Sequence, residues 1–232
     1  MERPEFDIVD LGTKHGGAIW EFLKNGKSFL RNEALEQRIN RGRCVGYERP
    51  QAADYRGKVE AKGYQFRLAD LADDKEIAAL PTSEIYLAWH FLEHVPNKEW
   101  AHKLVKASLT NSRHFAWFRL PSFEQDEQTG EGFLKKHGMR FTWTNWLGHP
   151  TPWLVSDCTN AIFEWSKEFP ERKFDLQIRP ADRMISLSDP RIVPIDTPVD
   201  VNEYSFEYGP KPSIGPFTTP IIAAWEVTVR FK

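Results

Sequence analysis

Cysteine is nearly absent from this chain of 232 residues, which contains only Cys44 and Cys158. The two lie far apart and lack the close spacing of paired metal ligands, so we expect neither a disulfide framework nor a cysteine-based metal site. The sequence also lacks an apolar N-terminal leader and any apolar run approaching the roughly 18 residues of a membrane-spanning helix. We therefore expect a soluble, cytoplasmic protein with no membrane partner.

The sequence also has no large excess of positive or negative charge. Lys and Arg number 31 and Asp and Glu number 33, which gives a net charge of −2, and the two signs are interspersed. Because no basic stripe is present, nucleic acid is not favoured as a partner. Hydrophobic residues make up 41% of the chain, with 9 Trp and 16 Phe. This composition supports a packed core, an aromatic ligand pocket, or both.

Short apolar runs alternate with helical segments in the first half of the chain. We expect strands at 6–12, 43–48, 64–71, 84–89 and 113–120, and helices at 16–24, 33–42 and 97–110. This alternation predicts an α/β fold with a doubly wound, mostly parallel, Rossmann-like sheet and helices on both faces. We assign residues 1–169 to this domain, with a last helix at 159–169.

Prolines recur from Pro170 to Pro220, which excludes a long helix there and predicts a loop-rich segment. The chain then ends in 225–231, where apolar and polar residues alternate as in a half-buried strand. We therefore expect residues 170–232 to form a partly β extension whose last strand packs on the same sheet.

The residues from His90 to His94 match H-x-x-E-H, the signature of one class of zinc peptidase. That chemistry needs both histidines on one continuous helix and a further ligand downstream. The residues before His90 are strand-like and Pro96 comes soon after His94, so a helix through the motif would span about one turn. No Glu downstream stands on an obvious second helix. A zinc hydrolase is therefore the least favoured interpretation, and no metal site is expected.

A second pattern appears where the expected strands end, because ligands bind at the carboxyl ends of strands in an open α/β sheet. These ends carry Asp10 with Gly12, Lys14 and Gly16, then Glu48, then Asp70-Leu71, and finally Trp89-His90 followed by "LEHVP" at 92–96. The succession resembles the class I S-adenosylmethionine-dependent methyltransferases. Their pattern is D/E-x-G-x-G-x-G, an acid closing the second strand, an Asp after the third, and "LEHV" after the fourth in the small-molecule branch.

The resemblance covers about residues 5–120 and implies transfer of a methyl group from S-adenosylmethionine to a small-molecule nucleophile. It implies that Gly12 and Gly16 let the backbone approach the cofactor closely. Asp10 would interact with the methionyl ammonium through loop amides or water. Glu48 would accept hydrogen bonds from both ribose hydroxyls.

The same resemblance gives roles to the third and fourth strand ends. Asp70 would accept from the adenine amino group, with the backbone amide of Leu71 facing the ring. Trp89 and His90 would lie near the methyl group. With a pKa near neutrality, His90 is a candidate general base, and His94 is a second candidate catalytic residue.

Two departures from the family pattern leave an alternative open. Lys14 stands where the family has its middle glycine, and Glu48 comes later than the ~20 residues after the glycines seen in the related dinucleotide fold. Residues 25–41 therefore look like an insertion, either a lid over the site or a surface elaboration. A non-catalytic relative that keeps the fold as a binding or interaction module is the second interpretation.

Aromatic residues also gather in "WTNWLGHPTPW", residues 143–153. Trp143, Trp146, His149 and Trp153 would either wall a substrate pocket or pack the later part of the chain against the sheet, and core packing is the favoured interpretation.

Overall fold

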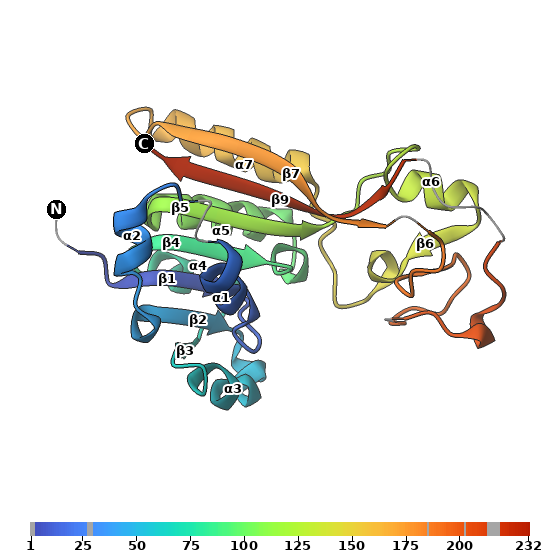
Figure 1. The fold of residues 1–232 in the computed structure, drawn as a ribbon, viewed down its shortest axis with the longest axis horizontal. Coiled ribbons are helices and arrows are strands. Elements are labelled where there is room, and N and C mark those ends of the chain that lie inside the picture. Colours follow the sequence, from blue (N-terminus) through green and yellow to red (C-terminus); the bar gives the residue numbers. More distant parts are fainter. Residues whose placement is uncertain (1–2, 27–29, 185, 202, 213–218) are drawn as a thin grey trace.

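The structure, a computed structural model, describes residues 3–26, 30–184, 186–201, 203–212 and 219–232. Its main layer is a seven-stranded sheet in the order β3-β2-β1-β4-β5-β9-β7 (Figure 1). The strands are β1 (Phe6–Leu11), β2 (Cys44–Glu48), β3 (Gln65–Leu68), β4 (Ser83–Trp89), β5 (Ser112–Pro121), β7 (Phe174–Met184) and β9 (Ile221–Phe231).

The first five strands pair in parallel, and β9 runs antiparallel to both of its neighbours, β5 and β7. Every residue of β1 and β2 is buried, as expected for parallel strands covered on both faces. The predicted doubly wound, mostly parallel α/β fold is confirmed. The strand expected at 225–231 lies within β9.

Helices cover both faces of the sheet. One face carries α1 (Gly17–Glu21), a π-helical turn (Phe22–Gly26), α2 (Glu33–Arg38) and α3 (Arg56–Glu60), and the other carries α4 (Asp74–Ala78), α5 (Lys98–Asn111) and α7 (Val155–Glu168). Short 3-10 helices span Arg41–Arg43, Pro50–Tyr55, Leu92–His94, Thr142–Asn145 and Phe206–Tyr208. Within the described ranges, no helix is long and apolar enough to cross a membrane.

The later part of the 25–41 insertion lies beside the amino-terminal ends of the strands. Arg38 pairs with Glu84, near the start of β4, at 2.6 Å, and the amide of Asn40 donates to Asp7 in β1 at 2.8 Å. Ligands of an open α/β sheet bind at the opposite, carboxyl ends. This part of the insertion therefore lies away from the carboxyl edge, and residues 27–29 lie outside the described residues.

A small lobe extends from the carboxyl ends of β5 and β7 (Figure 1). It contains α6 (Glu131–Lys136) and β6 (Met139–Phe141), from the stretch between β5 and α7, and β8 (Ile192–Pro194), from the stretch between β7 and β9. β6 and β8 pair antiparallel over a separate apolar core. The 170–232 segment thus contributes β7 and β9 to the main sheet and β8 to the small lobe.

The guanidinium of Arg140 joins the two stretches of the small lobe. This side chain is buried, and it donates to the backbone carbonyls of Phe141 at 3.0 Å, Thr197 at 2.8 Å and Pro198 at 3.2 Å. Burial lowers the pKa of Arg140. The carbonyl oxygens supply the acceptors that a buried cation requires.

We expect Arg140→Lys to lower the free energy of unfolding by about 1–3 kcal/mol, because an ammonium leaves several of these buried carbonyls without a donor. Urea denaturation measures the change. The matched control is Arg56→Lys in α3, whose ion pair with Glu60 is half exposed on both sides and contributes little. Equal losses in the two variants would contradict the anchoring role of Arg140.

Candidate functional site

The candidate site forms where the strand order reverses, between β1 and β4. From β1 the chain proceeds to β2 and β3 on one side of the sheet, and β4 and β5 continue it on the other. In open α/β sheets, ligands bind at the carboxyl edge of the sheet at such a point. Asp10, near the end of β1, lies between Gly46 of β2 and Leu87 of β4.

The loop after β1 is tied to the end of β2. The amides of Gly12 and Thr13 both donate to the carbonyl of Tyr47, at 2.9 and 3.1 Å, and the amide of Lys14 donates to the Glu48 carboxylate at 2.9 Å. Lys14 has φ 47°, in the left-handed region that disfavours a side chain. The loop therefore turns through a left-handed backbone at Lys14 although a side chain is present.

Gly12 is required by both its backbone and its surroundings. Its φ is 72°, and a side-chain carbon added there would lie 2.3 Å from the ring of Phe91. Gly16, also left-handed at φ 73°, is the N-cap of α1 and donates its amide to the carbonyl of Thr13 at 2.8 Å. The loops after β1 and β4 thus contact each other through Gly12 and Phe91.

Glu48 already accepts hydrogen bonds from the protein backbone. One carboxylate oxygen accepts from the amide of Lys14, and the other accepts from that of Arg49 at 3.1 Å. Each carboxylate oxygen has a second lone pair, so Glu48 retains acceptor capacity. Its role as the ribose ligand stays a prediction.

Asp10, near the end of β1, has a buried carboxyl group. Its side chain is 1% exposed, and neither carboxylate oxygen has a hydrogen-bond partner among the described residues. Burial raises the pKa of Asp10 to about 8, and the charge of Glu48 adds to this rise; the nearby Thr13 hydroxyl opposes it without reaching hydrogen-bond geometry. A buried carboxyl group without partners is costly, so this position favours a ligand or water that can donate to it.

The third strand end is arranged differently from the first two. Asp70 is exposed, and its side chain accepts from the amide of Ala72 at 3.1 Å, which fixes the turn before α4. The cap of α4 is Asp73 instead. The side chain of Leu71 is buried in the core beneath the sheet. The adenine contacts assigned to Asp70 and Leu71 stay predictions.

At the end of β4, Trp89 packs edge-on against Trp117, with ring centroids 4.8 Å apart, and the Arg119 guanidinium lies 5.5 Å from the ring of Trp89. His90 comes next with φ 50°, and its amide donates to the carbonyl of Arg119 at 2.8 Å. This backbone turn directs the chain out of the sheet toward the small lobe.

The pKa of His90 is lowered to about 3, mainly because the surrounding protein desolvates the ring, although 44% of the side chain is exposed, and further because Arg119 and Lys14 are cations. The expectation of a pKa near neutrality is therefore wrong. His90 is neutral at physiological pH, but it is a weak proton acceptor.

The H-x-x-E-H residues do not lie on a continuous helix. Only Leu92–His94 forms a single 3-10 turn. The Nδ1 atom of His94 lies 2.6 Å from the carbonyl oxygen of Gly148, and burial lowers the pKa of His94. The zinc-peptidase arrangement, which needs two helical turns, is absent from these residues.

Two further polar residues join the site. Glu93 is 1% exposed, its Oε2 atom has no hydrogen-bond partner among the described residues, and burial raises its pKa to about 8. His149 comes from the loop after β6, and its Nδ1 atom lies 3.0 Å from the carbonyl oxygen of Trp143. The sequence makes His149 only one of several pocket or core residues. The fold of the small lobe brings it to Glu93.

The aromatic stretch 143–153 divides between core and site. Trp153 is buried in the main core, and Trp143 stacks on Phe141 at 4.3 Å. Trp146 instead lies edge-on to the rings of His94 and His149, at 5.7 and 4.5 Å. Core packing, the favoured interpretation, holds for Trp153, whereas Trp146 flanks the polar cluster.

A cavity of about 330 Å³ lies in the small lobe next to this cluster. Phe123 connects the two, because it lines the cavity and lies edge-on to His149 with centroids 6.0 Å apart. The volume falls at the lower end of the range typical of small-ligand pockets. The other lining residues are Gln125, Glu131, Lys135, Arg140, Thr144, Asn145, Pro152 and Ile195.

Comparison with known proteins gives no matching family model and no matching curated protein. Among solved structures, a SAM dependent methyltransferase from Archaeoglobus fulgidus aligns with a TM-score of 0.56 at 13% identity, over 97% of this chain and 86% of that one. The chain has the fold of S-adenosylmethionine-dependent methyltransferases. The resemblance seen at the strand ends is confirmed at the level of the fold.

Two other structures with this fold are named for different kinds of methyltransferase. An O-methyltransferase family protein from Burkholderia thailandensis aligns with a TM-score of 0.55 at 10% identity, over 98% of this chain and 51% of that one. The small RNA methyltransferase HEN1 aligns with a TM-score of 0.55 at 11% identity, over the whole chain and 23% of that protein. This chain therefore spans about half of the first protein and less than a quarter of the second.

The raised pKa of Asp10 predicts a pH-dependent stability. An unfolded aspartate titrates near about 3.9, whereas folded Asp10 has a pKa of about 8. Between these values the folded chain holds a proton that the unfolded chain has released, so the stabilising contribution is complete below about pH 4 and is lost as the pH rises toward 8.

We therefore expect the wild-type chain to lose stability relative to Asp10→Asn between about pH 5 and about pH 8, by at most about 1.4 kcal/mol per pH unit. Urea denaturation of both proteins at each pH measures the difference and cancels the titration of other groups. A difference that does not change with pH would contradict the burial of an uncharged Asp10.

Proposed function

We propose that this protein is an S-adenosylmethionine-dependent methyltransferase that acts on a small-molecule nucleophile. The observation that carries the proposal is the buried, unpartnered carboxyl group of Asp10, beside a loop of left-handed residues at the point where the strand order reverses. Such a group fits a ligand that donates hydrogen bonds or carries positive charge, as the methionyl ammonium does.

The residues present fit this cofactor. Asp10 would face the methionyl end, Glu48 would accept from the ribose hydroxyls with its remaining lone pairs, and Asp70 with Leu71 would border the adenine. Gly12 and Gly16 keep the loop free of side chains where the backbone turns. S-adenosylmethionine supplies, when bound, a methyl group that its sulfonium already activates.

The chain's own contribution to methyl transfer is therefore mainly to position the acceptor and exclude water. Trp89 and His90 occupy the end of β4, and Trp146 and the cavity lined by Phe123 lie beyond them. His90 is unprotonated at neutral pH and is available to accept a hydrogen bond from an acceptor group. The size of the cavity favours a small acceptor over a polymer.

A second candidate function, a non-catalytic binding or interaction module, has specific support. The ring of Phe91 lies over Gly12, and the Glu48 carboxylate accepts from two backbone amides. Both contacts close part of the surface that a cofactor would use. Binding therefore requires Phe91 to move or the cofactor to pass beside it.

Calorimetric titration with S-adenosylmethionine and S-adenosylhomocysteine separates the two functions. We expect micromolar binding of both to the wild-type chain and at least about tenfold weaker binding to Glu48→Ala, equivalent to about 1.4 kcal/mol. Glu48→Gln retains one acceptor oxygen, so we expect an intermediate affinity.

The matched control is Glu60→Ala, which removes an exposed acid from α3 and should bind as the wild type does. Absence of binding to folded wild-type protein would reject the methyltransferase and favour the interaction module. Equal binding by wild type and Glu48→Ala would place the cofactor elsewhere.

A further inference from the structure

Three side chains that can ligate a metal converge at the boundary between the sheet and the small lobe. Glu93 and His94 come from the 3-10 turn after β4, and His149 comes from the loop after β6. One ligand atom from each of the three lies within 4.8 Å of the other two. The imidazole rings of His94 and His149 are 4.6 Å apart.

Backbone carbonyls determine which ring nitrogen of His94 and of His149 carries the proton. The Nδ1 atom of His94 lies 2.6 Å from the oxygen of Gly148, and that of His149 lies 3.0 Å from the oxygen of Trp143. A carbonyl oxygen only accepts hydrogen bonds, so each Nδ1 must carry the proton. In a neutral imidazole this leaves Nε2 as a free lone pair, which is the arrangement of histidines that ligate metals through Nε2.

The Glu93 carboxyl is an independent sign that the cluster takes a ligand. It is 1% exposed, and its Oε2 atom has no hydrogen-bond partner among the described residues. The Nδ1 atom of His90 lies 3.9 Å from the other oxygen, Oε1, which is too far for a hydrogen bond. A buried carboxyl in this position is stabilised by a cation that contacts it directly.

We propose that Glu93, His94 and His149 bind a divalent transition-metal ion. Two imidazole nitrogens and one carboxylate oxygen suit Zn²⁺, Co²⁺, Fe²⁺ or Mn²⁺ better than Ca²⁺ or Mg²⁺, which prefer oxygen ligands. Distances of about 2.0–2.2 Å from the ion to each ligand atom require the three side chains to close slightly around it.

The site differs from the zinc-peptidase arrangement expected of the same residues. His90 is not one of the ligands, and the third ligand comes from His149 in the small lobe rather than from a second helix. Three protein ligands leave at least one position for water or an oxygen ligand, as in catalytic rather than structural metal sites. The sequence alone predicts no metal site, because it does not show that His149 reaches this turn.

Metal binding would also join the two parts of the fold. Two ligands come after β4 of the main sheet and the third belongs to the small lobe, so an ion bridges them. A ligand that binds only the folded state stabilises it by mass action, so the ion should raise the midpoint of thermal unfolding.

The test uses the full chain, stripped of metal with a chelator and titrated with Co²⁺ in the absence of S-adenosylmethionine. We expect one equivalent to bind, a visible absorption band from Co²⁺ in a nitrogen and oxygen environment, displacement of that band by Zn²⁺, and a raised thermal midpoint. His149→Gln and Glu93→Gln should each weaken Co²⁺ binding at least about tenfold.

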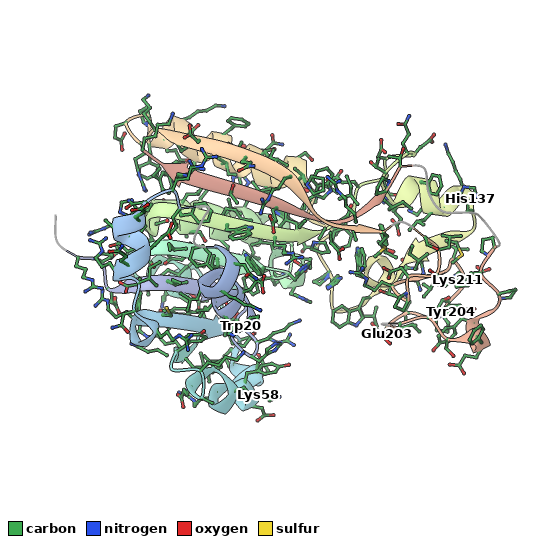
Figure 2. The ribbon with its side chains drawn as sticks, viewed as in Figure 1. Trp20, Lys58, His137, Glu203, Tyr204 and Lys211 are labelled. Atoms are coloured by element: carbon green, nitrogen blue, oxygen red, sulfur yellow. The ribbon has the colours of Figure 1, made fainter. Side chains whose placement is uncertain are left out.

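The matched control is His137→Gln, which removes an exposed histidine of the small lobe (Figure 2) that is not part of the cluster. It should bind Co²⁺ as the wild type does. Circular dichroism establishes that each variant is folded; if Glu93→Gln does not fold, the half-buried His149 supplies the test.

Absence of a visible band and of stoichiometric binding to the folded wild type would overturn the proposal, as would equal affinities of wild type and His149→Gln. Because the titration contains no S-adenosylmethionine, its outcome is separate from the proposed methyl transfer. Binding of Co²⁺ without binding of S-adenosylmethionine would support the metal site and reject the methyltransferase function.

Discussion

The parallel pairing of β1 with β4 is the constraint on which the site depends. It places two outgoing loops side by side at one edge of the sheet, one beginning near Asp10 and the other at Trp89 and His90. Hydrogen bonds from the first loop to Tyr47 and Glu48 then fix it to β2. The ends of three neighbouring strands thereby hold the candidate cofactor site together.

The small lobe adds residues to the site at the carboxyl edge of the sheet. Its two stretches leave the main sheet after β5 and after β7, and both return to it through α7 and β9. The lobe therefore cannot move freely from the carboxyl edge, and its loops bring Trp146 and His149 against His94. A group that reacts at the end of β4 would lie between the sheet and this lobe.

Local patterns in the sequence predict the first five strands because each is a short apolar run. Their parallel order follows from the helices between them. Asp10, Glu48 and Trp89 could be assigned because they end these runs. The proximity of Glu93 and His149 could not be predicted. It depends on the path of the chain between β5 and α7, which has no periodic pattern of its own. The alternating pattern of 225–231 predicts that the last strand packs on the main sheet, as β9 does, whereas the pairing of β7 with β9 is long-range and is obscured by the proline-rich sequence between them.

The central claim is that the carboxyl edge between β1 and β4 binds S-adenosylmethionine. A crystal structure of the chain grown with S-adenosylhomocysteine tests it most directly. We predict density for the ligand along the Gly12–Gly16 loop, with Asp10 and Glu48 within hydrogen-bond distance of it and the Phe91 ring turned away from Gly12. Density only in the small-lobe cavity, or an edge unchanged with Phe91 still over Gly12, would contradict the account.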